Sequence, residues 1–132
     1  MDLRNVVVAI SGASGSIYGI RVLQMLRQVE DVNSHLVITP SAKSTIGVET
    51  EYSVSEIEEL ADEVHSARDI GASIASGSFK TVGMIVAPCS IKTLSAIANS
   101  FGADLVSRAA DVTLKERRPL VLMVRELSLI HI

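Results

Sequence analysis

The stretch that decides the fold is VVVAISGASGSIYG, residues 6–19. Its first five residues, 6–10, are apolar and mostly β-branched, which is typical of a strand buried in a sheet. Three glycines and three serines follow within residues 10–19, and apolar residues at helical spacing come next. This order of strand, small-residue turn and helix predicts the first unit of an α/β domain, with the turn at the edge where such domains bind ligands.

The small-residue turn fits neither of the common phosphate-loop motifs. Gly12, Gly15 and Gly19 do not follow G-x-G-x-x-G, and no lysine stands where G-x-x-x-x-G-K-[ST] requires one. Two interpretations stay open. The backbone N–H groups and the Ser14 hydroxyl can bind a phosphate or another anion at the start of the helix, or the segment is a tight turn in which Ser14 caps the helix.

Length and composition limit the classes of protein to consider. The 132 residues are 48% hydrophobic and only 3% aromatic, which predicts one domain with an aliphatic core. A net charge of -3 gives no basic surface for nucleic acid, and no apolar run reaches the roughly 18 residues that a membrane span needs. Cys89 is the only cysteine, so neither an internal disulfide nor a multi-cysteine metal site is expected. These features predict a soluble, cytoplasmic protein.

The rest of the sequence predicts strands that alternate with helices. The expected strands are 5–10, 34–39, 84–87 and 119–124, and Pro88 is expected to end the third. The expected helices are 14–29, 41–50, 53–64, 92–99 and 104–116, with a loop and at most one short helix in 65–81. Such alternation implies parallel strands joined by right-handed crossovers, and therefore a doubly wound α/β sheet.

The segments that follow the expected strands are all rich in small or polar residues. They are SGASGS (11–16), TPSAK (39–43), PCSIKT (88–93) and RE (125–126). Because the carboxyl ends of parallel strands lie at one edge of the sheet, the four segments are expected to meet there. Their convergence predicts a ligand site more strongly than any one of the motifs does.

The PCSIKT segment offers several polar groups, each with a second interpretation. Ser90 and Thr93 can cap the next helix, and they can also present hydroxyls to a phosphate or a heterocycle. Lys92 can donate to an anion or lie in solvent. Cys89 has no histidine recognisably paired with it, so a buried residue is favoured over a nucleophile.

Charged residues in the second half of the chain leave similar alternatives. Arg108 and Lys115 are seven residues apart, so they share one face of a helix. Together with the nearby arginines they either bind a phosphate group or form a solvated basic surface; these arginines are Arg117, Arg118 and Arg125. Glu49 and Glu126 are candidates for an acid or a base, although single glutamates mostly lie on the surface.

The three histidines predict neither a catalytic triad nor a metal site. His35 is expected in a strand, His65 at a helix end and His131 near the end of the chain. From the residues alone, the sequence predicts a phosphate-bearing ligand at the edge of an α/β sheet and does not name a reaction.

Four stretches together closely resemble the UbiX-type flavin prenyltransferases, a family that includes the B subunits associated with phenolic-acid decarboxylases. The stretches are SGASGSIYGIRVLQML (11–26), ETEYS (49–53), SGSFKTVGMIVAPCSIKTLSAIA (76–98) and RAADVTLKERRPLVLMVRE (108–126). The resemblance runs from about residue 6 to residue 126, and RAADVTLKERRPLVL is its most specific part. It implies a flavodoxin-like or Rossmann-like fold and a homo-oligomer, commonly a dodecamer.

The resemblance also implies a reaction. Members of the family join a dimethylallyl group from dimethylallyl phosphate to N5 and C6 of reduced FMN, without a metal. The prenylated FMN then serves UbiD-type decarboxylases, in ubiquinone synthesis or in aromatic acid decarboxylation. Two alternatives remain: a non-catalytic FMN-binding accessory subunit of a (hydroxy)arylic acid decarboxylase, and another flavoprotein of this fold that decarboxylates a cysteine-containing substrate. The sequence lacks the catalytic histidine and the Asn-rich motif expected of that last class.

Residue by residue, the resemblance implies three sets of site residues. The implied FMN contacts are Gly12, Ala13, Ser14, Thr39, Ser90, Ile91, Lys92, Thr93 and Arg125. Thr39 stands where the family usually has serine, and it keeps the hydroxyl. Arg108 and Lys115 are implied to hold the dimethylallyl phosphate and to stabilise the departing phosphate. Ser14, Glu49 and Glu126 are implied at the reacting centre, the first two relaying protons at N5 and Glu126 donating one to the leaving group.

The last residues depart from the family pattern. Family members continue for roughly another third of their length, with a further strand, helical material, and a tyrosine and an arginine that also bind the prenyl phosphate. We therefore expect residues 1–126 to form an incomplete flavin-binding domain, with 127–132 (LSLIHI) as truncated or foreign sequence. Because the missing strand would leave an unpaired sheet edge, this polypeptide alone is expected to be poorly soluble or inactive.

Overall fold

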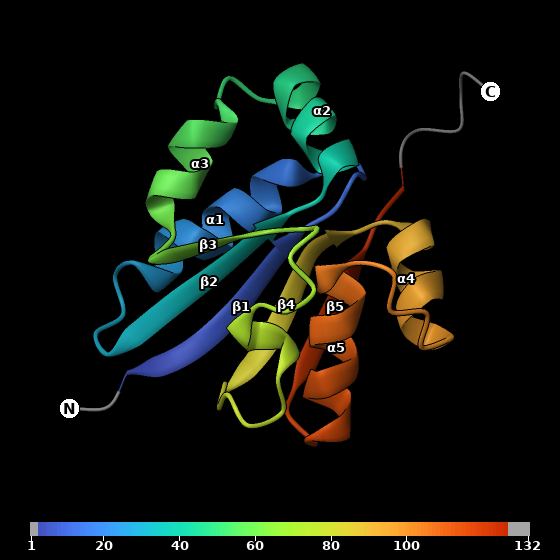
Figure 1. Ribbon diagram of the computed structural model, residues 1–132. Helices are drawn as coiled ribbons and strands as arrows, with labels where there is room; N and C mark the ends of the chain where they lie inside the picture. Colours follow the sequence, from blue (N-terminus) through green and yellow to red (C-terminus); the bar gives the residue numbers. More distant parts are fainter. Residues whose placement is uncertain (1–2, 127–132) are drawn as a thin grey trace.

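The computed structural model describes residues 3–126, so the expectations for residues 127–132 and for His131 lie outside the described residues. The described chain forms a five-stranded parallel sheet in the order β3-β2-β1-β4-β5 (Figure 1). The strands are β1 (Arg4–Ile10), β2 (Val32–Ile38), β3 (Glu63–Ser66), β4 (Gly83–Cys89) and β5 (Leu120–Val124). The helices are α1 (Ser16–Leu26), α2 (Pro40–Glu49), α3 (Val54–Leu60), the 3-10 turn η1 (Ser73–Ala75), α4 (Ile91–Ala98) and α5 (Leu105–Lys115).

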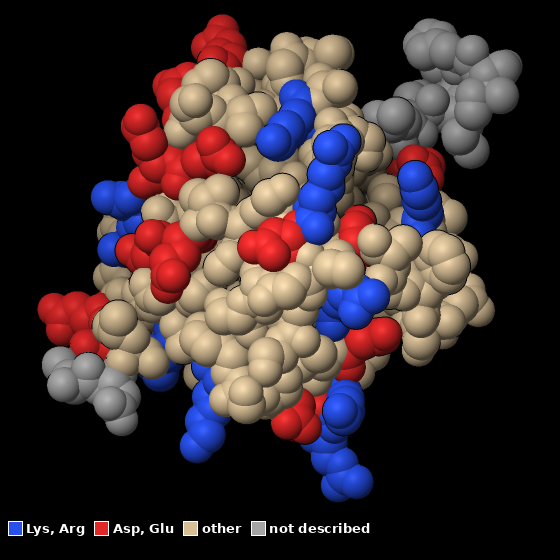
Figure 2. Space-filling view, in the orientation of Figure 1, with Lys and Arg blue, Asp and Glu red and all other residues tan. Residues whose placement is uncertain are grey.

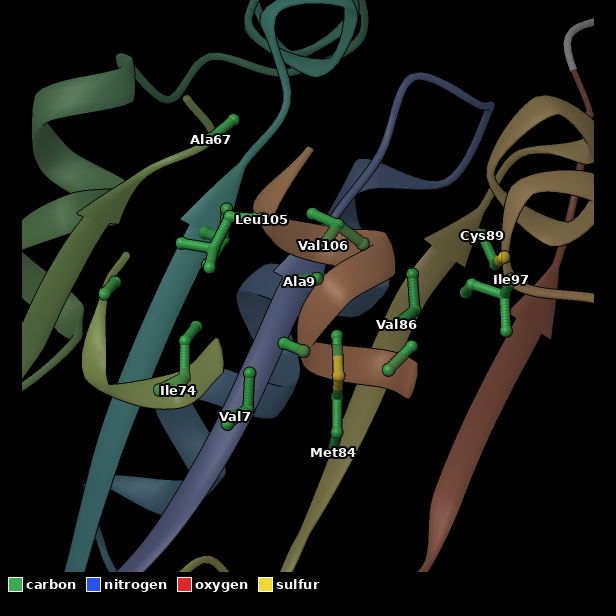
Figure 3. Close-up of a cluster of buried hydrophobic side chains, with 14 residues drawn as sticks. Val7, Ala9, Ala67, Ile74, Met84, Val86, Cys89, Ile97, Leu105 and Val106 are labelled. Carbon is green, nitrogen blue, oxygen red and sulfur yellow. The ribbon is translucent and has the colours of Figure 1, made fainter. Parts of the chain in front are cut away.

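Helices cover both faces of the sheet, as the alternating strands and helices predict. Alternate residues of β1 point to opposite faces, with Val8 and Ile10 in one apolar cluster and Val7 and Ala9 in the other. The first cluster is closed by α1, α2 and α3, and the second by η1, α4 and α5. Figure 3 shows the second cluster, where side chains of α5 pack over β1 and β4. The prediction of a doubly wound α/β fold is confirmed.

The strand β3 is the main error of the sequence-based interpretation, which extended one helix over 53–64 and left 65–81 without a strand. The helix α3 ends at Leu60, and Glu63–Ser66 pairs in parallel with β2. The Asp62 carboxylate accepts the backbone N–H of Ser34 at 2.8 Å, which fixes the start of this pairing. Because β3 is a short edge strand with mostly exposed side chains, no apolar run marks it in the sequence.

Two other boundaries differ from the predictions. Pro88 lies inside β4 and does not end it, and the pairing with β5 shifts register between Val86 and Cys89. Proline has no N–H to donate to the ladder, so such an irregularity is the place where a strand accommodates it. The helix α1 begins at Ser16 and ends at Leu26, after which the N–H groups of Gln28 and Val29 donate to carbonyls three residues back and tighten the last turn.

The strand β5 is the second edge of the sheet among the described residues. Its side chains are half-buried or exposed, and Val121 is 54% exposed. The carboxyl ends of β1, β2, β4 and β5 all open on the same side, so the four polar segments meet as predicted. We call this side of the sheet the carboxyl edge.

Candidate active site

Ser11 ties the turn after β1 to the segment after β4. Its fully buried hydroxyl donates to the carbonyl of Pro88 at 2.7 Å and accepts the backbone N–H of Ser90 at 2.8 Å. The backbone N–H of Ser11 also donates to the Pro88 carbonyl, at 3.2 Å. Three hydrogen bonds therefore hold the two segments in one position at the carboxyl edge.

The segment after β2 joins the same arrangement. The backbone N–H of Thr39 donates to the carbonyl of Ile10 at 3.0 Å, and the Thr39 hydroxyl caps α2 by accepting the N–H of Ala42 at 3.2 Å. A Cβ at Gly12 would stand 2.5 Å from Oγ of Ser41, so the absence of a side chain lets the turn after β1 approach the first turn of α2. The turn after β1 and the segment after β2 are thus adjacent at the carboxyl edge.

The start of α1 already carries an anion, and that anion belongs to the protein. Oε1 of Glu49, the last residue of α2, accepts the backbone N–H groups of Gly15 and Ser16 at 3.2 and 3.3 Å. Gly15 occupies the N-cap position with a φ of 100° and has no side chain of its own to cap the helix. The interpretation of Ser14 as the N-cap is therefore wrong, and the predicted anion position at this helix is filled by a carboxylate.

The Ser14 side chain reaches the segment after β5 instead. Its hydroxyl donates to the backbone carbonyl of Glu126 at 2.8 Å. The neighbouring Arg125 places its guanidinium carbon 5.3 Å from the centre of the Tyr18 ring, and its backbone N–H donates to the carbonyl of Cys89 at 2.9 Å. The structure therefore brings Ser14, Glu49, Arg125 and Glu126 together around the start of α1, and we call these four residues the polar cluster.

A pocket of about 810 Å³ also lies at the carboxyl edge, and its volume is within the size range of sites for small organic ligands. Three helices begin at its wall: α2 after Thr39, α4 after Ser90 and α5 after Asp104. The N-terminal ends of helices carry a partial positive charge, so this wall attracts anions. We call this cavity the phosphate pocket because its wall suits a phosphate group.

Four of the residues implied as FMN contacts line the phosphate pocket: Thr39, Ser90, Lys92 and Thr93. The Ser90 hydroxyl caps α4 by accepting the N–H of Thr93 at 3.1 Å and donates to the Thr93 hydroxyl at 3.0 Å. The remaining implied contacts lie around it. Ala13 is buried in the turn after β1, which also contains Gly12, and Ile91 is the half-exposed first residue of α4. Ser14 and Arg125 belong to the polar cluster.

The charges around the phosphate pocket favour an anionic ligand. Lys92 and Arg68 contribute positive charge to its wall, and Asp104 is the one carboxylate among the residues that line it. The Asp104 carboxylate is engaged at the start of α5, where Oδ1 accepts both the backbone N–H and the hydroxyl of Ser107 at 2.9 Å. Figure 2 shows several acidic side chains over the side of α3, with others scattered over the rest of this face, and α3 contributes no residue to the pocket.

The two residues implied to bind dimethylallyl phosphate lie at opposite ends of α5. Arg108 is in the first turn, beside Gly102 and near the phosphate pocket, whereas Lys115 is the last residue of the helix. A separation of seven residues corresponds to about 10 Å along the helix axis. Lys115 therefore lies at the end of α5 that is remote from the carboxyl edge. The structure therefore does not bring Lys115 to the polar cluster within one chain.

The single basic cluster that the sequence left open does not form. Arg125 follows the carboxyl end of β5, whereas Arg117 and Arg118 precede its amino end and so lie on the opposite side of the sheet from the carboxyl edge. The guanidinium of Arg118 is engaged there, donating to the carbonyls of Phe79 and Gly77 at 3.0 and 3.2 Å. Cys89 is a fully buried core residue, as favoured, and burial raises the pKa of its thiol to about 11.

Sequence reasoning missed three features of this region. Ser11 lies within the quoted turn, but nothing in the local pattern reveals its contacts with a segment more than seventy residues away. Arg68 lines the phosphate pocket because it follows β3, the strand that was not predicted. For the same reason the stacked pair of His35 and His65, with ring centres 5.2 Å apart, was not expected.

The parallel sheet, the helix N-termini at its carboxyl edge and the phosphate pocket define the class of protein as an α/β protein that binds a phosphate-bearing ligand. Comparison with known proteins narrows the class. The flavoprotein family model matches residues 1–128. Flavin prenyltransferase UbiX of Escherichia coli K12 is 58% identical over 127 residues, which cover 96% of this chain and 67% of that protein. The chain belongs to the flavoprotein family and, within it, to the UbiX-type flavin prenyltransferases, as the sequence resemblance predicted.

Other relatives agree with this assignment. UbiX of Thauera aromatica is 61% identical over 124 residues, or 94% of this chain and 63% of the relative. The crystal structure of AnUbiX (PadA1) in complex with FMN and dimethylallyl pyrophosphate superposes with a TM-score of 0.91 at 53% identity, covering 98% of this chain and 69% of that one. The dodecameric FMN-dependent UbiX-like decarboxylase of Escherichia coli O157:H7 also gives 0.91, at 50% identity over 96% and 70% of the two chains.

Within residues 3–126, no helix is long and apolar enough to cross a membrane. The same residues contain no group of three or more histidine, cysteine, aspartate or glutamate side chains arranged to hold a metal ion.

Proposed function

We propose that this protein is a flavin prenyltransferase, which joins a dimethylallyl group from dimethylallyl phosphate to N5 and C6 of reduced FMN without a metal. One observation carries the proposal: the polar cluster and the phosphate pocket both lie at the carboxyl edge, where Gly12 of the turn after β1 meets the pocket residue Ser41. The phosphate pocket can therefore hold a phosphate, and the polar cluster offers a hydroxyl, carboxylates and a guanidinium for the reaction. The membership of the UbiX-type family supports the same reaction.

The residues of the pocket fit the phosphate of FMN. The hydroxyls of Thr39, Ser90 and Thr93 stand at the starts of α2 and α4, where hydroxyl donors and backbone N–H groups suit phosphate oxygens. Lys92 adds a positive charge. Gly12, Ala13 and Ser14, in the turn after β1 at the same edge, would contact the bound FMN as the family resemblance implies.

When bound, reduced FMN supplies the nucleophilic positions N5 and C6. The chain's own residues then supply proton transfer and charge. The N–H groups of Gly15 and Ser16 hold the Glu49 carboxylate at the start of α1, next in sequence to Ser14, and we assign proton transfer at N5 to Glu49 and Ser14. The backbone carbonyl of Glu126 accepts the Ser14 hydroxyl, so this residue belongs to the polar cluster, and we assign to its carboxyl group the protonation of the leaving phosphate.

The prenyl phosphate contacts lead to a proposal about assembly. Arg108 and Lys115 lie on the exposed side of α5, and Lys115 is remote from the polar cluster of its own chain. A homo-oligomer in which α5 faces the carboxyl edge of a neighbouring copy would let both residues contact that copy's substrate. The dodecameric relative supports an assembly of this kind. We further propose that the protein acts in the cytoplasm and that a UbiD-type decarboxylase receives its product.

The proposal is tested in two stages. The purified chain is first titrated with FMN, and binding is expected. The protein is then incubated anaerobically with reduced FMN and dimethylallyl phosphate, and the flavin is analysed by mass spectrometry. A mass gain of one C5 prenyl unit is expected, and Lys115→Ala should abolish this gain while FMN stays bound. FMN binding without any gain would refute the transferase and support the alternative of a non-catalytic accessory subunit.

A further inference from the structure

Arg68 is a cationic residue of the phosphate pocket to which the family resemblance gives no role. It follows β3 directly, and the buried Ala67 before it accepts the backbone N–H of Leu105 at 3.0 Å, which joins this segment to the start of α5. The backbone N–H of Arg68 donates to the Ser66 hydroxyl at 3.3 Å, and the N–H of Asp69 donates to the Ser66 carbonyl at 3.0 Å. The backbone that carries Arg68 is therefore fixed on both sides.

The Arg68 guanidinium has no ion-pair partner among residues 3–126, where the one salt bridge joins His35 and Glu63. Asp104, the carboxylate of the pocket wall, is already engaged by Ser107 with two hydrogen bonds of 2.9 Å. The pocket thus presents two cations, Arg68 and Lys92, against one carboxylate that is committed elsewhere. An uncompensated pair of cations in a pocket of this size matches a ligand that carries two negative charges.

We propose that Arg68 binds the phosphate monoester of the ligand in this pocket and makes the site selective for phosphorylated flavin over riboflavin. Arg68 comes from the side of β3 and Lys92 from α4, so the two cations approach a phosphate from different walls. The planar guanidinium can donate two parallel hydrogen bonds to phosphate oxygens, which an ammonium group cannot do. This inference rests on the proposed function, because it assumes that the pocket receives a flavin phosphate.

Two phosphate monoesters occur in the proposed reaction, FMN and dimethylallyl phosphate. The lining residues favour FMN, since the pocket contains Thr39, Ser90 and Thr93 of the implied FMN set, whereas Lys115 of the prenyl phosphate set lies at the far end of α5. The two ligands share the same charged group. Only a binding experiment with each of them separates the two sources.

The experiment compares the wild-type protein with Arg68→Ala and Arg68→Lys. Dissociation constants are measured by calorimetry for FMN, riboflavin and dimethylallyl phosphate at low and high salt. Loss of a charge-assisted contact should weaken FMN binding by about 10- to 100-fold in Arg68→Ala, leave riboflavin binding unchanged and reduce the salt dependence. Arg68→Lys should restore part of the loss. Arg21→Ala is the control, because the Arg21 guanidinium bonds Gln24 on α1 at 2.8 Å, away from the pocket.

Each outcome decides the inference. Equal weakening of FMN and riboflavin, or no weakening of FMN, would overturn it, and a loss confined to dimethylallyl phosphate would move Arg68 to the other substrate and overturn the flavin selectivity. A wild-type protein that binds no FMN would overturn the proposed function as well. If the wild type binds and prenylates FMN but Arg68→Ala does so equally well, the inference fails and the proposed function stands. Unchanged circular dichroism in both variants excludes misfolding, since the described Arg68 contacts are made by its backbone.

Discussion

The Glu49 carboxylate accepts the backbone N–H of Gly15 at 3.2 Å, so the end of α2 neutralises the start of α1. This relationship changes the meaning of the glycine- and serine-rich turn. The start of α1 already has its anion, and we propose that the phosphate binds instead at the starts of α2, α4 and α5 around the pocket. The turn instead binds the Glu49 carboxylate through the N–H groups of Gly15 and Ser16, next in sequence to Ser14, and we propose that Glu49 and Ser14 transfer protons there.

Glu49→Gln should separate binding from chemistry. The glutamine oxygen can still accept an N–H of Gly15 or Ser16, so FMN affinity should stay near the wild-type value. Loss of the titratable group should lower the rate of prenyl transfer by about 100-fold or more. The control is Glu51→Gln, which changes an exposed carboxylate two residues away without touching α1. A variant that transfers at the wild-type rate would remove Glu49 from the mechanism.

Ser11→Ala should weaken the connection between the segments after β1 and β4. The substitution leaves the buried N–H of Ser90 without its acceptor, which should lower the free energy of unfolding by about 1–3 kcal/mol. Because Ser90 also caps α4 at the phosphate pocket, FMN affinity should fall as well. Urea denaturation and FMN titration measure the two effects. Ser44→Ala, an exposed position on α2, should change neither, and an equal loss in both variants would contradict this role of Ser11.

The predicted fold was correct because its signals are local and strong. β1, β2, β4 and β5 are apolar runs, and the caps of α3 and α4 at Ser53 and Ser90 are readable from sequence. β3 was not predictable in this way, because its four residues are mostly exposed and pairing with β2 holds them in place. A tertiary contact thus outweighed the local helical pattern of 53–64.

In the candidate site, too, the sequence predicts the features that local residue types determine and misses those that tertiary contacts determine. The residue types at the four strand ends indicated an anion site, and family resemblance named Glu49 and Arg125 as members. Sequence could not tell that Glu49 itself is the anion at the start of α1, because 34 residues separate it from Gly15. Arg68 was hidden for a related reason, since its place at the pocket depends on β3.

Gly19→Ala and Gly47→Ala should have opposite effects on stability. A Cβ at Gly19 would collide with the carbonyl oxygen of Ala87 and lie 2.7 Å from Cγ1 of Ile10, so α1 could not pack as closely on β1 and β4. Overpacking of this kind costs about 1–3 kcal/mol. A Cβ at Gly47 in α2 meets no atom within 4 Å, and alanine there should stabilise the protein by up to about 1 kcal/mol. Thermal unfolding of both variants checks the prediction, which fails if Gly19→Ala is neutral.

His35 should make the protein less stable as the pH falls. Its imidazole is buried in β2, with Nδ1 2.9 Å from Nε2 of His65 and Nε2 3.0 Å from Oδ1 of Asn5. Burial lowers the pKa of His35 below its usual value of 6.5, and the charge of His65 lowers this pKa too, although Glu63 and Asp62 partly oppose both effects. The edge strand β3, which carries His65 and Glu63, depends on these contacts.

The sign follows from proton uptake. Because the pKa of His35 is lower in the folded protein, the unfolded chain binds more protons as the pH falls through about 6.5, so stability decreases from there down to the folded pKa. One such group contributes a slope of at most about 1.4 kcal/mol per pH unit. Urea denaturation between pH 5 and 8 should show this decrease in the wild type and a flatter profile in His35→Gln. If the wild type and His35→Gln lose stability in parallel over that range, the pH dependence comes from other groups and the prediction for His35 is wrong.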